Sequence, residues 1–123
     1  MDRVARILVV EDDPVLRQLM VLTMAEEGYE VEEACDGGEA LEQAARMEFD
    51  VILLDIMMPK MDGWAFIERY TESEGQHARV IICSALIEAD PRVADLPAVG
   101  FLQKPFSLHD LCACVERSVQ QRR

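Results

Sequence analysis

Short apolar runs alternate along the chain with longer stretches in which apolar residues recur every three or four positions. The short runs are typical of buried β-strands, and the longer stretches are typical of helices with one buried face. This pattern predicts five strands, at residues 7–10, 29–34, 51–54, 80–83 and 99–103. It also predicts four full helices, which begin after side chains suited to helix capping, namely Asp13, Asp36, Asp62 and Ser107.

The segment between residues 88 and 97 fits this alternation least well. Pro91 can begin a helix there, because the first helical position needs no amide donor. Pro97 must end that helix, since proline lacks an amide donor and clashes with the preceding turn. We therefore expect a fourth of five helices that is short or irregular.

Continuous apolar strands joined by helices predict an α/β fold, in which a parallel sheet is covered by helices on both faces. Right-handed crossovers make such a sheet doubly wound. A chain of 123 residues can bury one hydrophobic core without disulfides or a structural metal. Because neither a linker nor a repeat interrupts the pattern, we expect one domain over residues 1–123.

Polar side chains follow four of the predicted strands directly. They are the carboxylates of Glu11, Asp12, Asp13 and Asp55, the hydroxyl of Ser84 and the ammonium group of Lys104. The carboxyl ends of parallel strands form one rim, where ligands bind in open α/β sheets. These side chains are therefore expected to converge in one pocket.

The carboxylates of this pocket need a cation. Two carboxylates about 4 Å apart repel by roughly 4 kcal/mol at an effective dielectric constant near 20. One lysine cannot neutralise three acids, and oxygen ligands suit Mg2+ or Mn2+. Alternatively, residues 11–13 form only a solvated helix N-terminus. Asp55 has no such explanation, because the next helix begins several residues later.

An aspartate beside a divalent ion, with a lysine and a hydroxyl facing it, can accept a phosphoryl group. The carboxylate is a nucleophile that forms acyl phosphates. The metal ion and Lys104 would neutralise the phosphoryl oxygens, and the Ser84 hydroxyl can donate a hydrogen bond to one of them.

Four motifs at these positions strongly resemble the receiver domain of two-component response regulators, in particular a chemotaxis-regulator-like single domain. They are ILVVEDDP at residues 7–14, LLDIMMPKMDG at 53–63, the Ser84-Ala85 pair, and FLQKPF at 101–106. The resemblance covers essentially the whole chain. It implies a five-stranded parallel sheet in the flavodoxin-like order 2-1-3-4-5.

The resemblance assigns a role to each acid of the pocket. Asp55 would take a phosphoryl group from a phosphohistidine on a sensor histidine kinase or a phosphotransfer protein. Asp12 and Asp55 would bind Mg2+ directly, or Mn2+ in its place. Glu11 would bind the ion through water, and the backbone carbonyl of Met57 would complete the protein ligands.

The resemblance also implies a switch. Lys104 would contact a phosphate oxygen, and the Lys104-Pro105 bond would be cis, which fixes the approach of the lysine. The Ser84 hydroxyl would move towards the phosphate. The Phe101 ring would then turn into the vacated space and change the surface near the fourth helix and fifth strand. A core aromatic without a switching role is the alternative for Phe101.

Two departures from the family pattern qualify this transfer of roles. The segment between Ser84 and Phe101 is about two residues shorter than usual, which again predicts a short fourth helix. Met57 and Leu86 flank the path of attacking water in the family. Because both are apolar and cannot orient a water, we expect slow self-dephosphorylation.

Three other functions are open to a chain of this pattern. A Mg2+-dependent phosphohydrolase with an Asp55 nucleophile usually carries a second acid two residues later, where this chain has Met57. A flavodoxin-like cofactor carrier needs a phosphate-binding loop after the first strand, where three acids would repel phosphate. A purely structural adaptor would not need the full set of pocket residues. A regulatory phosphoacceptor, rather than an enzyme, fits best.

The charge of the chain limits its partners. The 24 acidic and 12 basic residues give a net charge of -12, so neither nucleic acid nor an anionic membrane is expected as a direct partner. No signal peptide or membrane span is seen and the four cysteines lack metal or redox spacing, so we expect a cytoplasmic protein. It would control a downstream protein or a C-terminal effector domain, as a free-standing receiver or as part of a longer regulator.

Overall fold

A computed structural model describes residues 4–58, 62–75 and 77–122 of the chain. Five parallel strands form one sheet in the order β2-β1-β3-β4-β5. They are β1 (Arg6–Val10), β2 (Glu30–Ala34), β3 (Val51–Leu54), β4 (Arg79–Ser84) and β5 (Gly100–Gln103). The predicted doubly wound α/β fold and its strand order are confirmed.

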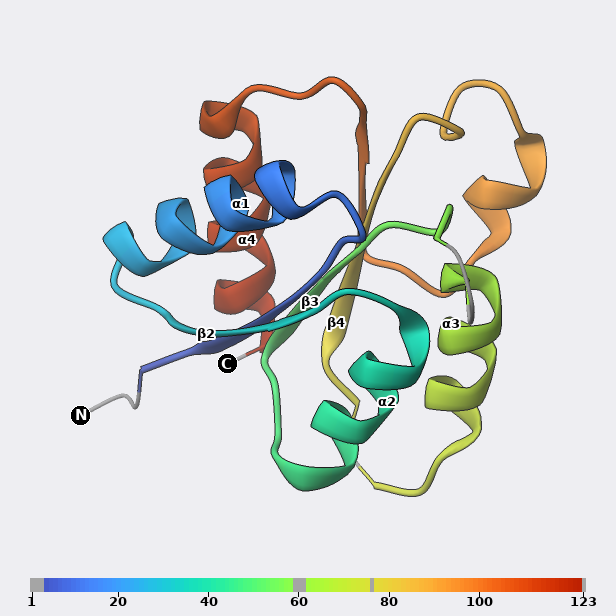
Figure 1. Ribbon diagram of the computed structural model, residues 1–123, viewed down its shortest axis with the longest axis horizontal. Helices are drawn as coiled ribbons and strands as arrows, with labels where there is room; N and C mark the ends of the chain where they lie inside the picture. The colour runs from blue at the N-terminus through green and yellow to red at the C-terminus, as the bar shows by residue number, and fades with distance from the viewer. Residues whose placement is uncertain (1–3, 59–61, 76, 123) are drawn as a thin grey trace.

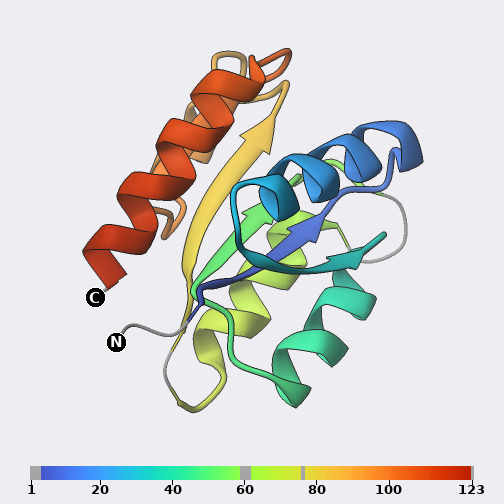
Figure 2. The same cartoon turned by 90° about the vertical axis from the view of Figure 1, so that its left-hand side faces the viewer.

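Four α-helices cover the two faces of the sheet. They are α1 (Pro14–Glu26), α2 (Gly37–Arg46), α3 (Gly63–Glu72) and α4 (Leu108–Arg122). Helices α1 and α4 lie on one face, and α2 and α3 lie on the other (Figures 1 and 2). Among the described residues, every helix is too short or too polar to cross a bilayer.

The core is divided in two by the sheet, because successive side chains of a strand point to opposite faces. Leu8 and Ile52 face α2 and α3, where Phe66 is fully buried. Ile7 and Leu53 face α1 and α4. Each central strand is therefore buried on both sides, which is why it reads as an uninterrupted apolar run.

The four predicted capping side chains all cap their helices. Each side chain accepts a hydrogen bond of 3.0 Å or less from a backbone amide of the first turn. Asp13 accepts from Val15, Asp36 from Glu39, Asp62 from Ala65 and Ser107 from Asp110. Gly28 ends α1 with a positive φ of 94°, a conformation that glycine adopts without strain. Residues 59–61, within the LLDIMMPKMDG motif, lie outside the described residues.

The fourth predicted helix is the short 3-10 helix η1 (Pro91–Asp95). The prediction of five helices is therefore corrected: the described residues form four α-helices and this one 3-10 helix. Asp90 caps it by accepting from the Arg92 amide at 3.0 Å. The next proline follows two residues after its end, which leaves no room for a regular helix. Val93 is fully buried and anchors the segment to the core.

Candidate functional site

Three acids come together at the carboxyl end of the sheet. Glu11 follows β1 and Asp55 follows β3, and with Asp12 each offers a carboxylate oxygen within 4.8 Å of the others. The backbone continues the sheet here, since the Asp55 amide donates to the Val10 carbonyl at 3.0 Å. Only 1% of Glu11 and 5% of Asp55 is exposed, so both carboxylates are held out of water.

Lys104 lies between two of these acids. Its Nζ is 2.6 Å from Glu11 Oε1 and 3.1 Å from Asp55 Oδ2, and 21% of its side chain is exposed. The residue follows β5, and its amide donates to the Ser84 carbonyl at 2.9 Å, which fixes the strand end from which the side chain extends. One ammonium group thus pairs with two carboxylates of a three-carboxylate cluster.

Burial and the neighbouring charges shift the pKa values of Glu11 and Lys104. Burial raises the pKa of Glu11 to about 7, although hydrogen bonds from Lys104 and from the Asp13 amide oppose the shift. Burial disfavours charged Lys104, but the hydrogen bond to Glu11 and the charge of Asp55 outweigh it and raise the pKa of Lys104. Above pH 7 the pocket therefore carries excess negative charge, which fits a divalent cation.

Ser84 ends β4 and begins a turn. Its side chain is fully buried, and its Oγ accepts a hydrogen bond from the Leu86 amide at 3.1 Å. A hydroxyl that accepts from the amide two residues on stabilises a tight turn. In this structure the Ser84 hydroxyl is therefore engaged by its own turn.

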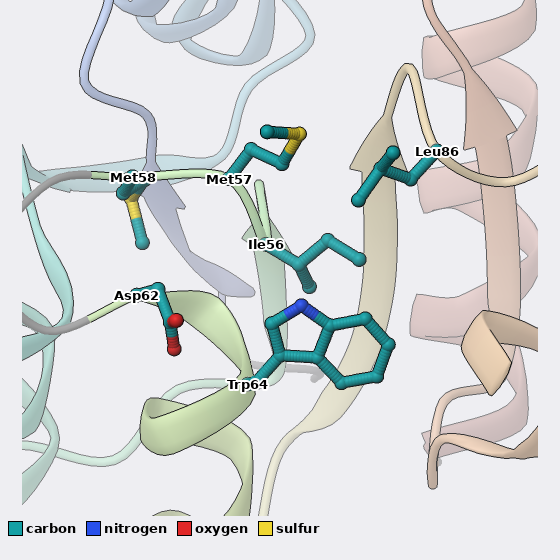
Figure 3. A pocket seen from close by; sticks show the side chains of 6 residues that line it. All are labelled: Ile56, Met57, Met58, Asp62, Trp64 and Leu86. Carbon is teal, nitrogen blue, oxygen red and sulfur yellow. The ribbon is translucent and has the colours of Figure 1, made fainter. Parts of the chain in front are cut away.

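A hollow of about 360 Å³ lies beside Asp55. It is lined by Ile56, Met57, Met58, Asp62, Trp64 and Leu86 (Figure 3). The Met57 amide donates to Asp55 Oδ1 at 3.0 Å, while 57% of the residue is exposed. The polar groups of this lining are the Asp62 carboxylate and the Trp64 indole N–H, whereas Met57 and Leu86 are apolar and cannot orient a water molecule.

Two other sequence-predicted features lie near Lys104. The Lys104-Pro105 bond is cis, as the resemblance implies. Phe101 is 36% exposed on β5, at the sheet edge. It is the most exposed residue of its strand.

Two polar residues next to the site were not predicted from the sequence. Arg17 Nη1 donates to the Glu11 carbonyl at 2.8 Å, and its Nε donates to Glu33 at 2.9 Å. The Gln103 side chain contacts the turn after Ser84. The only signal for Gln103 is its place as an amide between an apolar strand and Lys104, which does not reveal its partners.

Residues 7–116 match the family model of the response regulator receiver domain. The chain belongs to this family. Over 110 residues the receiver domain is 40% identical to the response regulator MprA of Mycobacterium leprae (strain TN), a match that covers 88% of this chain and 48% of MprA. The chain therefore spans about half the length of the curated relatives that it matches.

Solved receiver structures agree over nearly the whole chain. The receiver domain of the Francisella response regulator 1452 has a TM-score of 0.88 at 30% identity, covering 97% of this chain and 99% of that one. The response regulator TrrA from Thermotoga maritima, in complex with Mg(2+)-BeF, has a TM-score of 0.82 at 30% identity, covering 93% and 98%. The chain is thus a regulatory phosphoacceptor module of two-component signalling, and the phosphohydrolase alternative gains no support.

Proposed function

We propose that Asp55 is the phosphoryl acceptor of this receiver domain and that the donor is a phosphohistidine on a sensor histidine kinase or a phosphotransfer protein. The observation that carries the proposal is the position of the Asp55 carboxylate, which is buried in an acid cluster and paired with Lys104. Membership of the receiver family supports the same role.

Glu11, Asp12 and Asp55 would hold Mg2+, or Mn2+ in its place, with the backbone carbonyl of Met57. The fit rests on the donor set, because carboxylate and carbonyl oxygens are the ligands that these ions prefer. When bound, the ion neutralises negative charge on the acceptor and the phosphoryl oxygens. TrrA, a relative at 30% identity, is described in complex with Mg(2+)-BeF.

The transfer itself is a displacement at phosphorus. An oxygen of the Asp55 carboxylate attacks, a new O–P bond forms, and the N–P bond of the phosphohistidine breaks. The electron pair of that bond stays on the departing imidazole nitrogen. The Lys104 ammonium, already 3.1 Å from Asp55, is close enough to contact an oxygen of the transferred group.

Phosphorylation would act on the surface through Ser84. Its hydroxyl would leave the Leu86 amide and donate to a phosphoryl oxygen, which removes the turn's present capping bond. Phe101, now partly exposed, would turn into the space that the turn vacates. The surface around η1 and β5 would then differ between the two states.

The output would be protein contact within the cytoplasm. Either a downstream protein or a C-terminal effector domain would read the changed surface. More than half of MprA lies outside the region matched by this chain. The acidic charge of the domain supports protein contact over direct binding to nucleic acid or a membrane.

Intact-mass measurement after incubation with acetyl phosphate and Mg2+ tests the proposal. We expect one added phosphoryl group in the wild-type protein and none in Asp55→Asn. Addition to both proteins would reject Asp55 as the acceptor. Continuous release of phosphate over many turnovers would instead support a hydrolase.

A further inference from the structure

The Gln103 side chain connects the last residue of β5 to the turn that follows β4. Its Oε1 accepts a hydrogen bond from the Glu88 amide at 2.9 Å. Its Nε2 donates to the carbonyls of Ala85 at 3.0 Å and of Lys104 at 3.1 Å. Because a primary amide carries two N–H donors, both carbonyls can accept a hydrogen bond from Nε2 at the same time. One side chain thus holds both ends of residues 85–88.

The turn held by Gln103 is the turn that engages Ser84. The Ser84 hydroxyl accepts from the Leu86 amide at 3.1 Å, and the Leu86 carbonyl accepts from the amides of Ala89 and Asp90 at 3.1 and 2.9 Å. The Ser84 side chain and the Gln103 amide therefore stabilise one and the same arrangement of the backbone.

The short η1 makes this contact more important than it would be beside a full helix. Residues 85–89 form turns, and the only regular element described between β4 and β5 is the 3-10 helix Pro91–Asp95. A regular helix would hold the first residues after β4 through its own hydrogen bonds. Here a side chain from the neighbouring strand supplies hydrogen bonds that fix them.

We propose that Gln103 is a positioning residue that holds the turn in the form in which Ser84 is bonded to Leu86, and thereby favours the unphosphorylated state. The inference rests on the proposed function, in which Ser84 moves to the phosphoryl group. When Ser84 leaves the Leu86 amide, residues 85–88 shift, and the contacts of Gln103 with Ala85 and Glu88 break.

This role has a measurable consequence for ligand affinity. A ligand that binds only one conformation has an apparent affinity that falls with the fraction of protein in that conformation. Weakening the Gln103 contacts raises the fraction with a free Ser84 hydroxyl. The affinity for a phosphoryl analogue should rise accordingly.

Gln103→Met removes the hydrogen bonds and keeps the length of the side chain. The probe is beryllium fluoride with Mg2+, and binding is followed by the fluorescence of Trp64, which lines the hollow with Leu86. We expect binding that is about three- to tenfold tighter than in the wild-type protein. Gln120→Met, the same change at an exposed position of α4, is the matched control and should leave the affinity unchanged.

A second variant keeps the inference testable if Gln103→Met fails to fold. Gln103→Glu keeps the acceptor for the Glu88 amide but places a carboxylate against the two carbonyls, so it should also tighten binding. In the wild-type protein, saturation with the probe should speed hydrogen exchange of the Glu88 amide several-fold, as its bond to Gln103 breaks.

The outcomes separate this inference from the proposed function. If the wild-type protein binds the probe but the Gln103 variants bind it equally or less tightly, the Gln103 inference fails alone. A loss of thermal stability without a change of affinity would give Gln103 a purely structural role and also overturn it. If saturation with the probe leaves the hydrogen exchange of the Glu88 amide unchanged, the Gln103 inference is also overturned. If the wild-type protein fails to bind the probe, or if Asp55→Asn binds it equally well, the proposed function fails as well.

Discussion

Lys104 Nζ lies 2.6 Å from Glu11 Oε1, in an ion pair between residues 93 positions apart in the chain. The two residues follow β5 and β1, which are separated in the sheet by β3 and β4. The long side chain crosses both strands and passes Asp55 at the end of β3. Lys104 is therefore the internal cation of the acid cluster, and a metal ion or phosphoryl group must change its partners.

Removing this cation should destabilise the metal-free protein. Lys104→Met leaves the buried carboxylates of Glu11 and Asp55 without their ammonium partner, so we expect the free energy of unfolding to fall by about 2 kcal/mol. Mg2+ should restore more stability in the variant than in the wild-type protein. Urea unfolding with and without Mg2+ measures both effects.

Arg69→Met removes an exposed cation from α3 and serves as the control for Lys104→Met. It should change the free energy of unfolding little, with or without Mg2+. A Lys104→Met protein as stable as the wild type in the absence of Mg2+ would contradict the assigned role of the lysine.

The raised pKa of Glu11, about 7, should make Mg2+ binding dependent on pH. Below pH 7 the folded, metal-free protein holds a proton on Glu11 that the ion must displace, so the affinity should fall about tenfold from pH 8 to pH 6. Calorimetric titration at several pH values measures this. Because the pKa of Glu11 is higher in the folded than in the unfolded protein, its protonation stabilises the metal-free fold. This stabilisation is fully present below the pKa of the unfolded state and is lost as the pH rises through about 7.

Glu11→Gln removes the titrating group. Its Mg2+ affinity should be lower at pH 8 and should lose most of its dependence on pH between 6 and 8. A dependence equal to that of the wild-type protein would mean that another group governs binding.

The apolar side chains of Met57 and Leu86 beside Asp55 should prolong the life of the phosphorylated state. Replacing Leu86 with Gln and Met57 with Asn supplies groups that can orient a water molecule, so loss of the phosphoryl group should accelerate by about tenfold. The decay of phosphorylated protein, followed by intact mass after the donor is removed, measures the half-life. Leu108→Gln, an exposed position on α4, should leave it unchanged. An unaltered half-life in the double variant would refute the explanation.

Gly63 should tolerate no side chain, because α3 begins directly against the acceptor loop. A Cβ at this position would lie 2.3 Å from Ile56 Cα and 2.5 Å from the Asp55 carbonyl oxygen. Gly63→Ala should therefore lower the free energy of unfolding by about 3 kcal/mol and slow phosphorylation. At Gly38 the nearest atom is the Asp36 carboxylate at 3.3 Å, so Gly38→Ala should be close to neutral. Similar stability of the two variants in thermal unfolding would contradict this.

The sheet and the acid cluster could be predicted because both depend on local rules. Buried strands such as β3 read as apolar runs, and helix caps such as Asp36 follow from side-chain chemistry within a few residues. Parallel strands then bring their carboxyl ends together. Asp55 and Lys104, 49 positions apart, meet for that reason.

The remaining features depend on tertiary contacts that no local pattern encodes. The sequence indicates that the segment after β4 is short, but it does not indicate that a glutamine from β5 would hold its turn. Likewise, the guanidinium carbon of Arg92 lies 5.2 Å from the centre of the Trp64 ring, a contact that depends on how η1 packs against α3. Such contacts follow from the path of a loop in space, which spacing along the chain does not fix.

Reductive trapping of the phosphorylated protein tests the central claim most directly. Borohydride reduces an aspartyl phosphate to homoserine, so peptide mapping after treatment with a phosphodonor and Mg2+ identifies the acceptor among the clustered acids. We expect homoserine at position 55 alone, and none in Asp55→Asn. Homoserine at Asp12, or a reduced side chain at Glu11, would contradict the assignment of Asp55 as the phosphoryl acceptor.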